Sequence, residues 1–144
     1  HELAHVLTLG GWPDPGDMAV VEGLATYVQG ECAGYANGRV ARGVLDRRGL
    51  IPLDLLASGF RRQDDLQAYL QAASVIEFSI QAEGVGIVPV LWEQGLGAAP
   101  GLLDMTPSDF LSEFQGWLRE SFEPIPPPAL DAIRRSGCGI PKSM

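Results

Sequence analysis

Glycine and proline residues divide this chain into short segments, and this division limits the possible folds more than any other sequence feature. The 144 residues include 18 Gly and 11 Pro, and both residue types interrupt helices and strands. Between these breaks, apolar residues recur mostly at the spacing of an amphipathic helix. We therefore expect a mainly α fold built from short helices, with no convincing pair of strands.

Two segments show the helical pattern most clearly. Residues 64–83 form the longest periodic stretch, with charge at its start in Asp64, and Thr106 followed by Pro107 is a good helix start. The helix that begins there places Phe110, Phe114 and Trp117 on one face, which predicts core packing. In full, helices are predicted over 1–9, 18–31 (capped by Asp17), 39–48, 51–57, 64–83, 87–94, 106–122 and 129–135.

The composition excludes several partners. Hydrophobic residues make up 46% of the chain and charged residues 19%, so there are enough apolar side chains to form a hydrophobic core. The net charge of −8 argues against nucleic acid or an anionic membrane surface, because both need a positive face. The apolar runs are shorter than the ~20 residues of a bilayer span. Cys32 and Cys138 form either one disulfide or two buried thiols, and their spacing does not decide.

The only two histidines of the chain, His1 and His5, stand four positions apart in the sequence HELAH. On a helix, residues i and i+4 share a face with Cβ atoms about 5–6 Å apart, so the two imidazoles can hold one metal ion. Glu2 lies at the edge of this face, where it can reach a metal-bound water as a general base. The HExxH pattern therefore predicts a zinc site.

A site with two histidines needs a third protein ligand, and Glu22 is the candidate. It is the only charged residue in the otherwise apolar or neutral run from Met18 to Gln29. A buried charge without a partner costs free energy, so we expect this carboxylate to have a positively charged partner. A zinc ion would be such a partner. A tight turn over the Gly/Pro-rich residues 10–17 would bring Glu22 back toward the first helix.

HELAH followed by EGLATY resembles the gluzincin clan of zinc metallopeptidases. The pattern is similar to the aminopeptidase-N-like family, in which HExxH is followed by an EGxAxY segment, and more similar still to the bacterial peptidase MA-like families. The segments AYLQAASVIEFSIQAEG and TPSDFLSEFQGWLRE resemble later helices of those families. The resemblance thus spans about residues 1–120 of the chain.

This resemblance implies a role for each matched residue. His1, His5 and Glu22 would bind one Zn²⁺ ion, and Glu2 would take a proton from the bound water and pass it to the leaving amine. Tyr69 would donate a hydrogen bond to the tetrahedral oxyanion. Thr26, one turn after Glu22, would orient a ligand. The activity implied is zinc-dependent hydrolysis of peptide bonds in a peptide or protein substrate.

The resemblance also sets the expected domain organisation. Residues 1–122 would be the C-terminal, helical part of a zincin catalytic domain whose upstream β-sheet is absent here, so we expect the chain to be a piece of a longer protein. Residues 123–144 would be a Pro-rich connector and a C-terminal tail. The gap between His5 and Glu22 is shorter than in the aminopeptidase and thermolysin patterns. A secreted or cell-surface location fits the resemblance, although the sequence itself does not determine the compartment.

Other interpretations stay open for several residues. Tyr69 is equally well a core tyrosine, and Thr26 an ordinary helix residue. The pairs Arg47-Arg48 and Arg61-Arg62 either bind a substrate carboxylate or are solvated. Two further functions compete with the peptidase: an inactive zinc-binding module used for binding, and a metal-free helical interaction domain.

Overall fold

The computed structural model describes residues 11–138, which are mainly helical, as predicted. The predicted helix over residues 1–9 lies outside the described range. The helices are α2 (Met18–Gln29), α3 (Asn37–Arg48), α4 (Leu53–Ser58), α5 (Asp65–Glu83), α6 (Ile87–Gln94), α7 (Ala99–Leu102), α8 (Pro107–Ser121) and α9 (Pro127–Ser136). Two 3₁₀ turns, η1 (Phe60–Arg62) and η2 (Leu96–Ala98), and two strands, β1 (Glu31–Cys32) and β2 (Tyr35–Ala36), complete the described elements.

Side-chain caps explain why three of the predicted helices begin where they do. Asp17 accepts a hydrogen bond from the N–H of Val20 at 2.8 Å, which starts α2. Asp64 accepts from Gln67 at 3.1 Å to start α5, and Thr106 caps α8. Each cap satisfies an N–H group that has no partner within its own helix.

The prediction that the chain has no strand pair was wrong. β1 and β2 form a short antiparallel hairpin in which Cys32 lies opposite Tyr35. The turn between them places Ala33 at φ 51° and Gly34 at φ 90°, and two successive positive φ angles match the right-handed twist of a hairpin. Strands of two residues are too short to show an alternating pattern, so the sequence carries no signal for them.

The helix predicted over 39–48 begins earlier, at Asn37. The Asn37 side chain donates a hydrogen bond to the backbone carbonyl of Thr26 in α2 at 2.8 Å. This contact joins residues that are distant in the sequence, and the periodicity of the segment does not report it.

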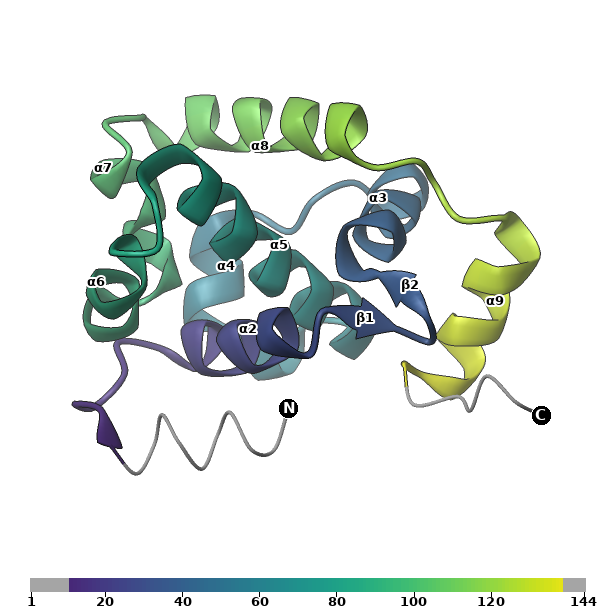
Figure 1. Cartoon of the computed structure of the whole chain (residues 1–144), viewed down its shortest axis with the longest axis horizontal. Helices are drawn as coiled ribbons and strands as arrows, with labels where there is room; N and C mark the ends of the chain where they lie inside the picture. Colours follow the sequence, from purple (N-terminus) through teal and green to yellow (C-terminus); the bar gives the residue numbers. More distant parts are fainter. Residues whose placement is uncertain (1–10, 139–144) are drawn as a thin grey trace.

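Helix α5 runs through the middle of the fold, with α2 on one side and α8 on the other (Figure 1). The ring of Phe78 on α5 lies 5.5 Å from Phe110, 5.8 Å from Phe114 and 5.4 Å from Trp117 on α8, measured between ring centroids. Phe110 and Phe114 are completely buried, as predicted for this face of the helix. Aromatic burial of this kind contributes much of the stability of a core.

The C-terminal part of the described chain is tied back to the hairpin and to α3. Arg39 donates hydrogen bonds to the carbonyls of Glu123 and Pro124 in the connector. Helix α9 then packs against α3, and a disulfide joins Cys32 of β1 to Cys138. Of the two alternatives that the sequence leaves open, the cysteines form the disulfide.

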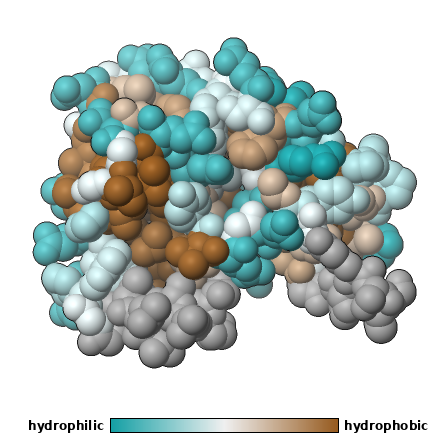
Figure 2. Space-filling view, viewed as in Figure 1, coloured by the Kyte–Doolittle hydropathy of each residue, from teal (hydrophilic) through white to brown (hydrophobic). Residues whose placement is uncertain are grey.

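On the face drawn in Figure 2, the most hydrophobic side chains gather in an area on the left, and smaller apolar areas lie elsewhere among hydrophilic side chains. Exposed apolar residues of the described range include Val28 on α2 and Val85 between α5 and α6. Exposed apolar residues are normal on a folded protein. Within residues 11–138, no helix combines the length and the apolar character that crossing a bilayer requires.

Candidate functional site

Glu22 is a buried carboxylate on α2, as the apolar run around it predicted. Its side chain is only 10% exposed, and its Oε1 atom lies 3.5 Å from Nη2 of Arg61. Arg61 belongs to the 3₁₀ turn η1, just before α5. The carboxylate therefore faces a cation from a neighbouring segment rather than open solvent.

Tyr69 comes from α5 and meets the same arginine. Its hydroxyl accepts a hydrogen bond from Nη1 of Arg61 at 3.3 Å, and its ring packs against Phe60 at 5.2 Å between centroids. Burial raises the pKa of the Tyr69 hydroxyl above its usual value of 10.0, the charge of Glu22 raises it further, and Arg61 opposes both effects. Tyr69 is therefore protonated near neutral pH and available as a hydrogen-bond donor.

Arg61 thus links two residues that the sequence analysis singled out separately. Glu22 lies on α2 and Tyr69 on α5, two helices that pack against each other, and one guanidinium contacts both. Sequence reasoning left Arg61 as either a carboxylate binder or a solvated side chain. The need of a buried carboxylate for a counter-charge was the available signal, but it did not indicate which of the 10 basic residues would supply it.

Thr26 lies one turn after Glu22 and is buried. Its hydroxyl donates a hydrogen bond to the backbone carbonyl of Glu22 at 2.8 Å. This bond fixes the helix backbone that carries Glu22, and it leaves the orientation of the carboxylate to other contacts. Such a bond is common for threonine within helices, so the geometry equally suits an ordinary helix residue.

The remaining predicted site residues, His1, Glu2 and His5, lie outside the described residues. Between residues 11 and 138, no three His, Cys, Asp or Glu side chains come together as a metal-binding group. A glutamate carboxylate held on a helix and shielded from water is a donor that zinc accepts. The described part of the candidate site therefore fits one of the three expected zinc ligands.

A groove of about 460 Å³ lies beside these residues. This volume is within the range of roughly 300–1,000 Å³ typical of ligand sites. Tyr69 and Thr26 line the groove, with Leu66, Leu70 and Ile133 as apolar lining. Its charged lining residues are Glu31, Asp64, Asp65 and Arg134. The groove places room for a ligand beside the Tyr69 side chain, whereas Glu22 and Arg61 do not line it.

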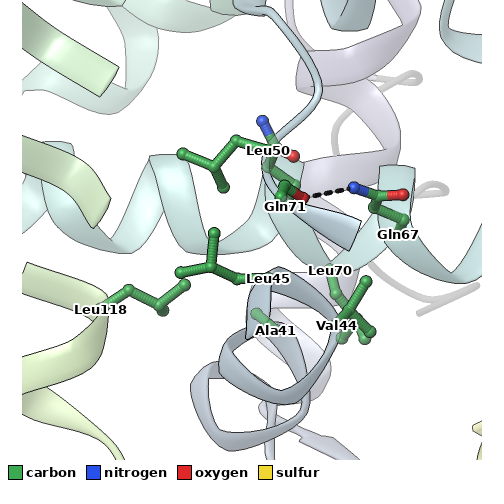
Figure 3. Close-up of a pocket in the computed structure, with 9 residues that line it drawn as sticks. Ala41, Val44, Leu45, Leu50, Gln67, Leu70, Gln71 and Leu118 are labelled. Atoms are coloured by element: carbon green, nitrogen blue, oxygen red, sulfur yellow. Dashed lines mark hydrogen bonds between the residues drawn. The ribbon is translucent and has the colours of Figure 1, made fainter. Parts of the chain in front are cut away.

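A second cavity, between α3, α5 and α8, is far smaller. Figure 3 shows its lining, in which the amide of Gln67 donates a hydrogen bond to the carbonyl of Gly49 at 2.8 Å. Gln71 pairs with both the N–H and the carbonyl of Ile51. The cavity measures about 10 Å³, which is room for roughly one water molecule. It is a small gap in the packing and too small for a substrate.

Comparison of the chain with protein-family models, with curated proteins and with solved structures gave no match.

Proposed function

We propose that the chain is the helical part of a gluzincin-type zinc peptidase that hydrolyses peptide bonds. The observation that carries the proposal is the meeting of Glu22 and Tyr69 around Arg61 across the α2–α5 packing. These are the two described residues to which the resemblance gives a ligand and an oxyanion-donor role. The HELAH sequence provides the other two expected ligands, His1 and His5, and the expected general base, Glu2.

In this proposal His1, His5 and Glu22 hold one zinc ion. Zinc would supply a Lewis acid that polarises the substrate carbonyl and makes water acidic enough to attack it near pH 7. Glu2 accepts the proton of the attacking water and delivers it to the leaving amine. Tyr69, whose phenol is protonated near neutral pH, donates a hydrogen bond to the oxygen that becomes negative as the peptide carbonyl is attacked.

The test combines zinc content with activity on a library of internally quenched peptides. Glu2→Gln is expected to keep one zinc per chain and to lose most activity, whereas Glu22→Gln is expected to lose both. Glu83→Gln, at the exposed end of α5, is the control for loss of one negative charge. Full turnover by Glu2→Gln would remove that residue from the mechanism.

The same measurements separate the two competing functions. One zinc per chain without hydrolysis of any library peptide would identify an inactive zinc-binding module. A wild-type chain that binds no zinc would support the third function, a metal-free helical interaction domain.

A further inference from the structure

We propose that Arg61 is a positioning residue that holds the Glu22 carboxylate and the Tyr69 hydroxyl in one fixed relation across the α2–α5 packing. The inference deepens the proposed function and, in its zinc and activity readouts, rests on it. It starts from the guanidinium, whose two terminal nitrogens go to different residues: Nη2 lies 3.5 Å from Oε1 of Glu22, and Nη1 donates to the Tyr69 hydroxyl at 3.3 Å.

The guanidinium is suited to this task because it is planar and its donors form a rigid fork. Two groups bound by separate nitrogens of one fork cannot move independently of each other. The Tyr69 oxygen accepts from Arg61, so the hydroxyl proton of Tyr69 points away from the guanidinium. Arg61 therefore constrains both the direction of the carboxylate and the direction in which Tyr69 donates.

Arg61 contacts side chains of two helices from its own turn η1. Its neighbour Phe60 is buried and packs against the Tyr69 ring, so two residues of η1 contact Tyr69 on α5. Nη2 of Arg61 also lies 3.7 Å from Sδ of Met18 at the start of α2.

Removing Arg61 is expected to affect both the site and the stability of the fold. The Arg61 side chain is 64% exposed, but that of Glu22 is only 10% exposed, and a buried carboxylate left without its counter-charge costs free energy. Outer partners of a metal ligand typically change metal affinity or activity by about 10–100-fold when removed. The melting temperature of each Arg61 variant is therefore measured first, and zinc affinity and kinetics are compared at a temperature at which the variant is folded.

The chain offers a matched control in Arg62. It belongs to the same 3₁₀ turn and carries the same charge, but its guanidinium lies close to Gly59. Arg61→Gln and Arg62→Gln thus remove the same charge from neighbouring positions. Arg61→Lys keeps the charge but offers a single ammonium, which cannot reproduce the fork.

The experiment measures zinc affinity by competition with a chromophoric chelator, and kcat and KM on a peptide chosen from the library above. Arg61→Gln is expected to weaken zinc binding and to lower kcat, each about tenfold, with KM changed less than about twofold. Arg62→Gln should match the wild type, and Arg61→Lys should recover only part of the loss.

Three results would overturn the proposal. Arg61→Gln and Arg62→Gln behaving alike would show that the position has no special role. A rise in KM alone would make Arg61 a binder of a substrate carboxylate. Tighter zinc binding in Arg61→Gln would make the guanidinium a competitor of the metal for Glu22.

A readout without metal separates this proposal from the proposed function. If Glu22→Gln leaves zinc binding unchanged, Glu22 is not a zinc ligand and the proposed zinc site is wrong. The positioning role of Arg61 is then tested through the ring resonances of ¹³C-labelled tyrosine. The Tyr69 resonance, assigned with Tyr69→Phe, should shift in Arg61→Gln and not in Arg62→Gln. An unshifted resonance would overturn the positioning role.

Discussion

Gly23 of α2 lies directly against Ala72 of α5, and a Cβ atom at Gly23 would stand 2.8 Å from the Cβ of Ala72. The two helices therefore approach each other as closely as they do because one of them lacks a side chain at this point. Gly23 immediately follows Glu22, so this contact also sets the distance between the candidate ligand and α5.

We expect Gly23→Ala to force α2 away from α5 and to lower the free energy of unfolding by about 1–3 kcal/mol. Gly116 in α8 has nothing within 4 Å of its missing Cβ, so Gly116→Ala should stabilise the protein by about 0.5–1 kcal/mol. Urea denaturation of both variants measures the contrast. Equal effects of the two substitutions would contradict the close packing at Gly23.

Removing the disulfide should destabilise the fold strongly. The bond between Cys32 and Cys138 closes a loop of 106 residues, and closing a loop of this size limits the unfolded chain. The double variant Cys32→Ala, Cys138→Ala is expected to lose about 2–5 kcal/mol of unfolding free energy. A reductant should lower the wild-type stability by a similar amount and leave the double variant unchanged, and a wild type that ignores the reductant would contradict the pairing.

The free energy of unfolding should depend on pH because the carboxyl of Glu77 is partly buried. Burial raises the pKa of this carboxyl above 4.5, so the folded state binds the proton more tightly than the unfolded state. The free energy of unfolding should therefore fall as the pH rises from about 4.5 through the raised folded pKa. Glu77→Gln should abolish this decline and be more stable than the wild type at pH 7.

Chemical denaturation at a series of pH values measures this effect. Glu83→Gln, exposed at the end of the same helix, controls for the loss of one negative charge. A Glu77→Gln profile that runs parallel to the wild type would show that burial of Glu77 carries no cost.

Tyr69→Phe isolates the hydroxyl from the ring. The phenylalanine keeps the packing against Phe60 and loses the group proposed to stabilise the oxyanion. Loss of one such donor typically lowers kcat about 10²–10³-fold, and zinc affinity should change little because the hydroxyl is not a proposed ligand. Tyr27→Phe, on α2, is the control, and an equal loss of kcat in both variants would contradict the role of Tyr69.

Much of the helical framework follows from local chemistry. Asp17 and Thr106 cap the helices that they were expected to cap, and Asp64, expected as a charge at the start of its helix, also caps it. These positions were predictable because a cap is a contact between residues three positions apart. The burial of Glu22 was predictable for a similar reason, since the residues around it are apolar.

The features that the sequence did not reveal have two causes. The hairpin is local, but it places Ala33 at a positive φ, which alanine rarely adopts. The other features depend on contacts between distant residues, such as the hydrogen bond from Asn37 to Thr26 of another helix. The partnership of Arg61 with Glu22 and Tyr69 requires η1, α2 and α5 to be packed first. Such pairings follow from the assembled fold and leave no periodic pattern in the chain.

The bond between Cys32 and Cys138 has a consequence for the order of events during biosynthesis. A ribosome makes Cys32 106 residues before Cys138, so the thiol of Cys32 has no native partner until residue 138 has been synthesised. The helices between the two cysteines can therefore assemble before the crosslink forms. Oxidation can then lock helices that have already packed against one another.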